Sequence, residues 1–192
     1  MRDGKEISGS REGDAWKGLA AGLIGGLAAS WTMNRFQDVW VKLSEGNEKS
    51  PGGQRFSQQE MGIWNTVQQQ SSEEQDDTTV RTASAISEGI FDHKLTRSEK
   101  KIAGPAVHYA LGTAVGGLYG AAAELAPNVT AGAGLPFGAA FWLVVDETAV
   151  PVLGLSKPPT HYPVSTHVYA LASHLVYGLT AELVRRTLRR AL

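Results

Sequence analysis

Charged and apolar residues are separated into long blocks along this chain. Asp, Glu, Lys and Arg are absent from four windows, which are residues 18–34, 103–123, 125–145 and 158–181. Each window is close to the roughly 20 residues that a helix needs to cross the hydrocarbon core of a bilayer. Buried helices of a soluble bundle are the alternative, but such helices normally keep a charged stripe that faces water. The pattern therefore favours four transmembrane helices.

Capping and proline signals indicate where these helices begin and end. The first covers residues 16–43, because its apolar pattern continues past Ser30 as an amphipathic extension. A cleaved signal peptide is the alternative, although the four acidic residues ahead of this segment disfavour it. The second covers residues 96–126 and begins at a Thr96-x-x-Glu99 capping box. The third covers residues 130–155, a Pro-rich turn covers 156–164, and the fourth helix with a basic C-terminus covers 165–192.

A polar insert, residues 44–95, separates the first two predicted helices. It is rich in Gln, Ser, Asp and Glu, and it offers few apolar side chains to bury. We therefore expect it to be partly disordered. Within it, Val80, Ala83, Ile86 and Ile90 are spaced as on one face of a helix, which predicts a short amphipathic helix at residues 78–91.

Basic residues at both ends of the chain predict its orientation. Four lie in the first 17 residues, and Arg185, Arg186, Arg189 and Arg190 lie at the C-terminus. Four crossings place both ends on one side, and the positive-inside rule makes that side cytoplasmic. The prediction is a bacterial inner-membrane protein with a cytoplasmic tail at residues 1–15, an extracytoplasmic insert and the lipid bilayer as its first partner.

Two parts of the chain resemble each other. Residues 119–125 and 177–183 are identical at five of seven positions, and an Ala-Ala-x-Trp pattern begins at Ala28 and again at Ala139. Coincidence in Ala/Gly-rich sequence is the alternative to a duplication. The duplication predicts an all-α, polytopic membrane fold of four transmembrane helices, arranged as two parallel two-helix repeats.

Small residues at four-residue spacing predict helix packing. In lipid, such residues let helix backbones approach closely, and they mark contacts within a bundle, across a homo-oligomer or with a membrane-complex partner. The residues concerned are Gly18, Gly22, Gly26, Gly112, Gly116, Gly120, Gly134 and Gly138.

Composition excludes several classes of function. The 18 Lys and Arg against 19 Asp and Glu give a net charge of −1, which leaves no electrostatic case for nucleic-acid binding. No cysteine is present, so disulfides, thiol nucleophiles and Cys-ligated metals are excluded. No nucleotide-binding, serine-hydrolase or zinc-protease motif occurs. We expect no enzymatic activity, no cofactor and no metal.

Ionisable residues in or beside the spans are the candidate functional groups, because charge at membrane depth is costly. Glu124 and Glu182 are predicted to form interfacial ion pairs with Arg185 and Arg186. A second set of five could meet in the outer half of the bundle as polar adhesion between helices, as a proton-responsive cluster or, last, as a metal or haem site. These five are His108, Asp146, Glu147, His167 and His174.

The second span and the C-terminal half resemble the YagU-like family of small bacterial inner-membrane proteins with a domain of unknown function. The resemblance is carried by Ala103-Gly104 through His108, Gly117-x-Tyr119, Ala123-Glu124-Leu125-Ala126-Pro127, Pro151-x-x-Gly154-Leu155, Pro158-Pro159, His174-Leu175-Val176-Tyr177 and Glu182-Leu183-Val184-Arg185-Arg186. It covers residues 100–190, the first span only weakly and the insert not at all. It implies an inner-membrane location and, loosely, a role in acid tolerance.

These features lead to three hypotheses for function. The first is a non-catalytic inner-membrane protein that supports acid or envelope stress tolerance through a pH-responsive His/Asp/Glu cluster. The second is a non-catalytic membrane subunit that packs against a larger complex. The third is a small proton, ion or solute transporter.

Overall fold

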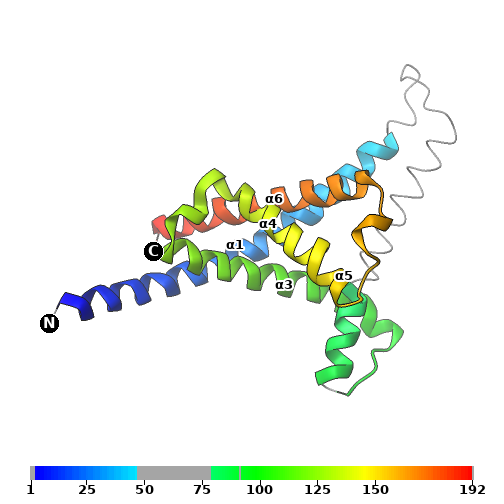
Figure 1. The fold of residues 1–192 in the computed structure, drawn as a ribbon, viewed down its shortest axis with the longest axis horizontal. Helices are drawn as coiled ribbons and strands as arrows, with labels where there is room; N and C mark the ends of the chain where they lie inside the picture. The colour runs from blue at the N-terminus through cyan, green and yellow to red at the C-terminus, as the bar shows by residue number, and fades with distance from the viewer. Residues whose placement is uncertain (1–2, 47–78, 91, 192) are drawn as a thin grey trace. The chain divides into compact units, whose positions relative to one another are not determined.

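The computed structural model describes residues 3–46, 79–90 and 92–191, and all regular structure among them is helical. The long elements are α1 (Asp3–Gly46), a helix at residues 79–90, α3 (Arg97–Leu125), α4 (Leu135–Val144) and α6 (Val164–Ala191) (Figure 1). The all-α prediction is confirmed for this part of the chain. The helix expected at residues 78–91 is present, whereas residues 47–78 of the insert lie outside the described residues.

The segment predicted as one helix over 130–155 is interrupted. It starts as the 3₁₀ segment η2 (Pro127–Gly134), in which Ala131, Gly132 and Ala133 leave helical geometry. After α4 come the π-helical turn η3 (Val145–Ala149) and the short α5 (Val150–Val152). Gly132 and Gly134 adopt positive φ, which glycine tolerates best, and Pro151 has no N–H to donate within a helix. The single 130–155 helix was therefore wrong in detail.

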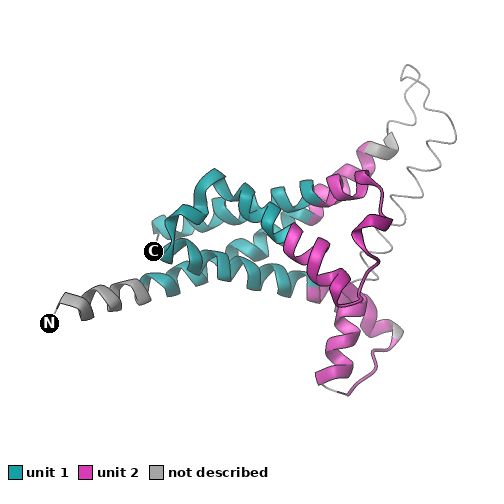
Figure 2. Cartoon of the chain, viewed as in Figure 1, with its two compact units in different colours: residues 1–33, 108–142, 171–192 teal, residues 34–107, 143–170 magenta. Residues whose placement is uncertain are grey.

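The chain divides into two compact units (Figure 2). Unit 1 comprises residues 1–33, 108–142 and 171–192, and unit 2 comprises residues 34–107 and 143–170. Each is described below by itself.

In unit 1, glycines bring two pairs of helices into backbone contact. A Cβ on Gly22 of α1 would lie 2.3 Å from the Gly116 carbonyl oxygen of α3, and one on Gly26 would lie 2.4 Å from that of Gly112. A Cβ on Gly138 of α4 would likewise lie 2.2 Å from the His174 carbonyl oxygen of α6. Only residues without a side chain permit such an approach, so the small-residue spacing corresponds to helix crossings within the chain.

The two crossings correspond position by position. Gly18 approaches the carbonyl oxygen of Gly120, and Gly134 approaches that of Gly178. Position 120 becomes 178 by adding 58, which is the offset between the two matching sequences. The same contacts pair Gly18 with Gly134, at an offset of 116. The Ala-Ala-x-Trp pattern of the sequence has an offset of 111, so it does not mark equivalent positions of α1 and α4.

Two hydrogen bonds define the direction of α3 and α6. The Tyr177 hydroxyl donates to the Gly112 carbonyl at 2.5 Å, and the Tyr119 hydroxyl donates to Glu182 at 2.9 Å. Residue numbers therefore rise together along both helices, which run parallel. The core beside them contains Ala29, Met33, Tyr177 and Ala181, with Phe137 and Phe141 packed against it.

Unit 2 contains a hairpin formed by the helix at 79–90 and the start of α3. Gly104 lies against Val80, whose Cγ2 would be 3.0 Å from a Cβ at that position. The predicted capping box is formed, since the Thr96 N–H donates to Glu99 at 2.6 Å and the Glu99 N–H donates to the Thr96 hydroxyl at 3.4 Å. Elsewhere in this unit, the rings of Trp40 and Tyr169 lie 5.9 Å apart.

One helical segment among the described residues, Pro127–Val152, is long and apolar enough by itself to cross a membrane. Only 11% of its most apolar window is buried within the protein. No other described helix is both long and apolar enough to cross a membrane by itself.

Candidate functional site

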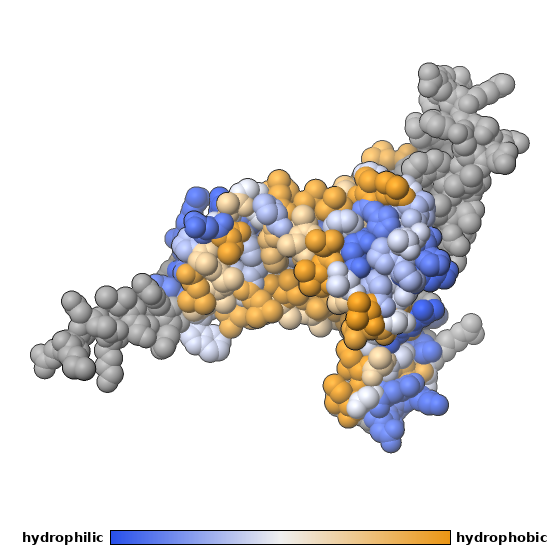
Figure 3. Space-filling view, in the orientation of Figure 1, coloured by the Kyte–Doolittle hydropathy of each residue, from blue (hydrophilic) through white to orange (hydrophobic). Residues whose placement is uncertain are grey.

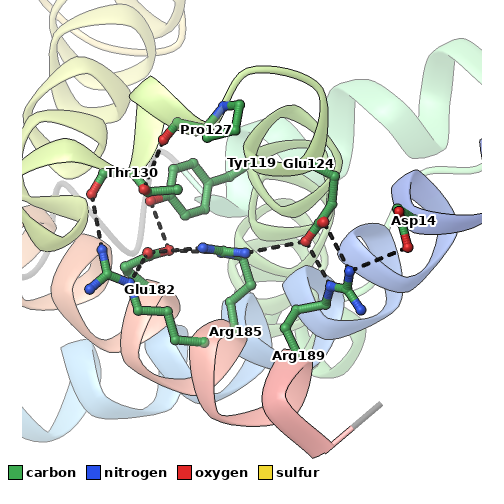
Figure 4. A network of polar contacts seen from close by, with 9 residues as sticks. Asp14, Tyr119, Glu124, Pro127, Thr130, Glu182, Arg185 and Arg189 are labelled. Atoms are coloured by element: carbon green, nitrogen blue, oxygen red, sulfur yellow. Dashed lines mark hydrogen bonds and ion pairs between the residues drawn. The ribbon is translucent and has the colours of Figure 1, made fainter. Parts of the chain in front are cut away.

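Glu182 is the centre of a buried polar network in unit 1 (Figure 4). It belongs to α6 and is fully buried, at 0% exposure. Arg185, one turn later, donates to both of its carboxylate oxygens, at 2.8 and 3.0 Å. Arg186 donates to one of the same oxygens, and the Tyr119 hydroxyl donates to the other at 2.9 Å. Each oxygen of this carboxylate thus accepts two hydrogen bonds.

Glu124 extends the network to the end of α3. Arg189 of α6 donates to its two oxygens at 2.7 and 2.9 Å, and Arg185 lies 3.4 Å from the nearer one. Arg189 also lies 3.6 Å from Asp14 of α1, and Arg186 donates to the Thr130 carbonyl of η2 at 3.3 Å. The network therefore joins α1, α3, η2 and α6 at one end of unit 1 (Figure 4).

The charges of this network balance, with three carboxylates against three guanidinium groups. Isolated buried charges would be very costly, whereas paired and fully hydrogen-bonded ones are tolerated. The hydrogen bonds from Arg189 hold the pKa of Glu124 below its ordinary value, despite the opposing effect of partial burial. Such a balanced network stabilises a helix arrangement and leaves no unpaired charge for an ionic ligand among its six charged side chains.

Unit 2 holds a second pair of ionisable side chains. Nδ1 of His167 lies 2.6 Å from Glu147, and Nε2 of the same ring lies 3.1 Å from the Pro159 carbonyl oxygen. Both side chains are largely buried, at 25% and 15% exposure. Glu147 belongs to the π-helical turn η3, where the Thr148 hydroxyl donates to the Leu143 carbonyl. Asp146, its neighbour, is half-buried in the same turn.

The other two histidines lie in unit 1. His174 is buried at 4% exposure and contacts the Phe141 ring edge-on, with ring centroids 5.1 Å apart. His108 lies near enough to His174 for an electrostatic interaction, and its Nε2 has no hydrogen-bond partner among the described residues. Two fully buried serines, Ser30 and Ser173, add to the polar character of this interior.

The five residues expected to converge are divided between the two units. His108 and His174 belong to unit 1, and Asp146, Glu147 and His167 belong to unit 2. No three His, Asp or Glu side chains among the described residues are arranged to hold a metal ion. Within unit 2 the structure shows the contact of His167 with Glu147, and the meeting of all five residues stays a prediction.

The ion-pair group is larger than the sequence indicated. The helical spacing of Glu182, Arg185 and Arg186 pointed to their pairing, and the structure shows it. Arg189, Tyr119 and Asp14 were missed, because their partners lie on other helices. The repeat of Tyr119 and Glu124 at Tyr177 and Glu182 was the one available signal, since it marks equivalent positions of α3 and α6.

The family described as Protein of unknown function (DUF1440) matches residues 57–183, well over half of the chain. The chain belongs to the DUF1440 family. No curated protein and no solved structure matches the sequence. The DUF1440 region includes the hairpin of unit 2, both ionisable groups and Glu182, but it ends before Arg185 and Arg189.

Proposed function

We propose that this DUF1440 chain is a non-catalytic integral membrane protein of the bacterial inner membrane. Four helical segments cross the bilayer as two parallel two-helix repeats, and the protein supports acid or envelope stress tolerance.

The observation that carries the membrane assignment is the outward position of the large aliphatic residues. Among the described residues, the buried ones include no Leu, Ile or Val, whereas Ala, Ser and Tyr are buried. In proteins that fold in water, large aliphatic residues are among the most often buried. In unit 1 they point outward instead, as Ile24, Leu27 and Leu118 do at 54%, 51% and 68% exposure. Figure 3 shows apolar side chains over much of the visible face of these helices.

Lipid explains this distribution. Acyl chains solvate Leu and Ile as well as a protein core does, so small residues take the helix contacts and large ones face outward. The little-buried segment Pro127–Val152 fits the same explanation, because a core helix in water would be covered by its neighbours. Apolar surface of this extent otherwise indicates a protein interface.

The two glycine crossings support the repeat arrangement. The pair α1 and α3 and the pair α4 and α6 use equivalent contacts, and α3 runs parallel to α6. Two antiparallel pairs related in this way would place Asp14, Thr130 and the C-terminal arginines at one membrane surface. The C-terminal arginines favour the cytoplasmic surface as the location of this end of the helices.

For acid tolerance, the supporting contact is that of His167 with Glu147. A carboxylate and an imidazole lie 2.6 Å apart in this contact, and imidazole is the side chain type used most often in pH-sensing sites. The resemblance to YagU-like proteins points in the same direction. The pH-responsive candidates in this proposal are His108, Asp146, Glu147, His167 and His174.

A role as a subunit of a larger membrane complex is the second candidate. The outward aliphatic surface of unit 1 would serve a protein partner as well as lipid. The predicted glycine positions would not, because Gly22, Gly26 and Gly138 are already in contact with other helices of the chain. No observation specifically favours the third candidate, a transporter.

Membrane fractionation tests the proposal. The full chain, expressed in a bacterium, should stay in the inner-membrane fraction after washing with alkaline carbonate and should be released by detergent. A reporter that is active only in the cytoplasm should be active when it is fused to the C-terminus, and a reporter that is active only outside the cytoplasm should be inactive there. Recovery of folded protein in the aqueous supernatant would contradict the proposal.

A further inference from the structure

The hairpin of unit 2, residues 79–107, has one apolar side and one charged side. Ile86, Ile90 and Ile102 are exposed at 43%, 72% and 73%. Figure 3 shows apolar side chains gathered along one side of this hairpin and hydrophilic ones along the other. On the helix at 79–90, Arg81 and Glu88 lie roughly opposite Ile86 and Ile90 by helical geometry.

Packing contacts and hydrogen bonds within the hairpin fix its conformation. Gly104 packs against Val80 at its base, and Ser87 donates from its hydroxyl to the His93 carbonyl at 2.7 Å near its tip. The capping box at Thr96 and Glu99 then restarts the chain as α3. The backbone hydrogen bond of Thr96 holds the pKa of Glu99 below its ordinary value, with smaller contributions from the Thr96 hydroxyl and His93. The exposed isoleucines therefore belong to a defined fold and form an apolar surface on it.

The position of the hairpin along the chain indicates what its apolar surface contacts. Lys100 and Lys101 are exposed and are the last charged residues before the apolar window 103–123. Ile102 follows them and begins a four-residue spacing of exposed positions, Ala106, Ala110, Ala114 and Leu118, along α3. If this window enters the bilayer, Lys100, Lys101 and Ile102 lie at its headgroup boundary.

Pro105 lies inside α3 at the same boundary. A proline there cannot donate a hydrogen bond to the Lys101 carbonyl, and proline is a frequent cause of helix kinks. The helix can therefore change direction between the hairpin and the apolar window.

We propose that the hairpin is an interfacial anchor that lies on the outer lipid surface of the membrane. The three isoleucines enter the acyl boundary, and Lys94, Lys100 and Lys101 contact phospholipid phosphates. Amphipathic helices bind bilayers in this way, through buried apolar area and attraction to anionic headgroups. The inference rests on the proposed membrane insertion and adds a lipid-binding surface to it.

Single-cysteine spin labels test this surface, because the chain has no cysteine of its own. Labels at Ile90→Cys, Glu88→Cys and Leu118→Cys are compared in full-length protein, reconstituted in phosphatidylethanolamine–phosphatidylglycerol vesicles. Collision with oxygen reports lipid, and collision with a water-soluble nickel chelate reports water. The expected result is lipid exposure at Leu118→Cys and Ile90→Cys, and water exposure at Glu88→Cys.

The outcomes separate the two proposals. Water exposure at Ile90→Cys with lipid exposure at Leu118→Cys would overturn the anchor and leave membrane insertion standing. Water exposure at both positions would overturn membrane insertion itself. Shielding of Ile90→Cys from both reagents that disappears when the protein is diluted in lipid would assign the surface to a second copy of the chain, which also overturns the anchor.

Replacing Lys100 and Lys101 by Gln should weaken the lipid exposure of Ile90→Cys most when phosphatidylglycerol is present, and an equal effect without it would contradict the phosphate contact.

Discussion

Arg189 donates two hydrogen bonds to Glu124, at 2.7 and 2.9 Å, and this pair joins the last turns of α6 to the end of α3. The side chains are only 20% and 16% exposed, so water competes weakly with the contact. The pair connects α6 to α3 at a point where α3 gives way to η2.

Loss of this pair should destabilise unit 1. The substitution Glu124→Gln removes the carboxylate and leaves Arg189 with Asp14 at 3.6 Å as its remaining acidic contact in the network. We expect the free energy of unfolding to fall by about 1.5–3 kcal/mol, the usual contribution of a hydrogen bond to a charged group. Unfolding of the detergent-solubilised protein, followed by helical circular dichroism, measures the change. Glu88→Gln is the matched control at an exposed position and should have no effect; equal effects would contradict the assignment.

The same pair predicts how stability depends on pH. Arg189 lowers the folded-state pKa of Glu124, so the stabilisation is fully present above the ordinary carboxyl value of 4.5. It is lost as the pH falls from that value through the lower folded-state pKa. The stability difference between the wild-type chain and Glu124→Gln should therefore shrink in acid. A difference that grew below pH 4.5 would contradict this sign.

The surroundings of two glycines predict opposite effects on stability when each is replaced by alanine. Gly22→Ala puts a methyl group 2.3 Å from the Gly116 carbonyl oxygen, which forces α1 and α3 apart. We expect a loss of about 1–3 kcal/mol, typical of overpacking. Gly89→Ala meets nothing within 4 Å and should stabilise its helix by up to about 1 kcal/mol. Comparable stability of the two variants would show that the crossing is not tight.

The proposed role in acid predicts a loss of function without loss of protein. Replacing His108, His167 and His174 together by Gln should abolish any acid-survival advantage that the chain confers. Protein levels in the membrane should stay normal. His161→Gln is the control, since this histidine is exposed and its side chain takes part in neither ionisable group. Unchanged survival of the triple variant at normal levels would contradict the role.

Sequence reasoning succeeded where the physical cause is local. The helix at 78–91 and the capping box at Thr96 depend on residues a few positions apart, and both are present. The pairing of Glu182 with Arg185 and Arg186 also follows from helical spacing. The break at η2 was missed because Gly134 read equally well as a helix-packing residue, and only the backbone shows the positive φ of Gly132 and Gly134.

Contacts between residues of different helices could not be predicted from the sequence. Arg189 has no acidic residue one turn away, so its contact with Glu124 depends on the parallel arrangement of α3 and α6. The convergence of the five ionisable residues stays a prediction, because a helix face gives direction but not distance. The family match adds no residue roles that could fill this gap.

Labelling from within the bilayer tests the central claim, that the outward aliphatic residues of unit 1 face lipid. The reconstituted chain is irradiated with an apolar carbene precursor dissolved in the membrane, and modified positions are read by mass spectrometry. The account predicts labels at Leu27 of α1, Leu118 of α3 and Leu179 of α6, together with labels in Pro127–Val152. Labels confined to Pro127–Val152, with the three leucines modified instead by a water-borne radical, would contradict it.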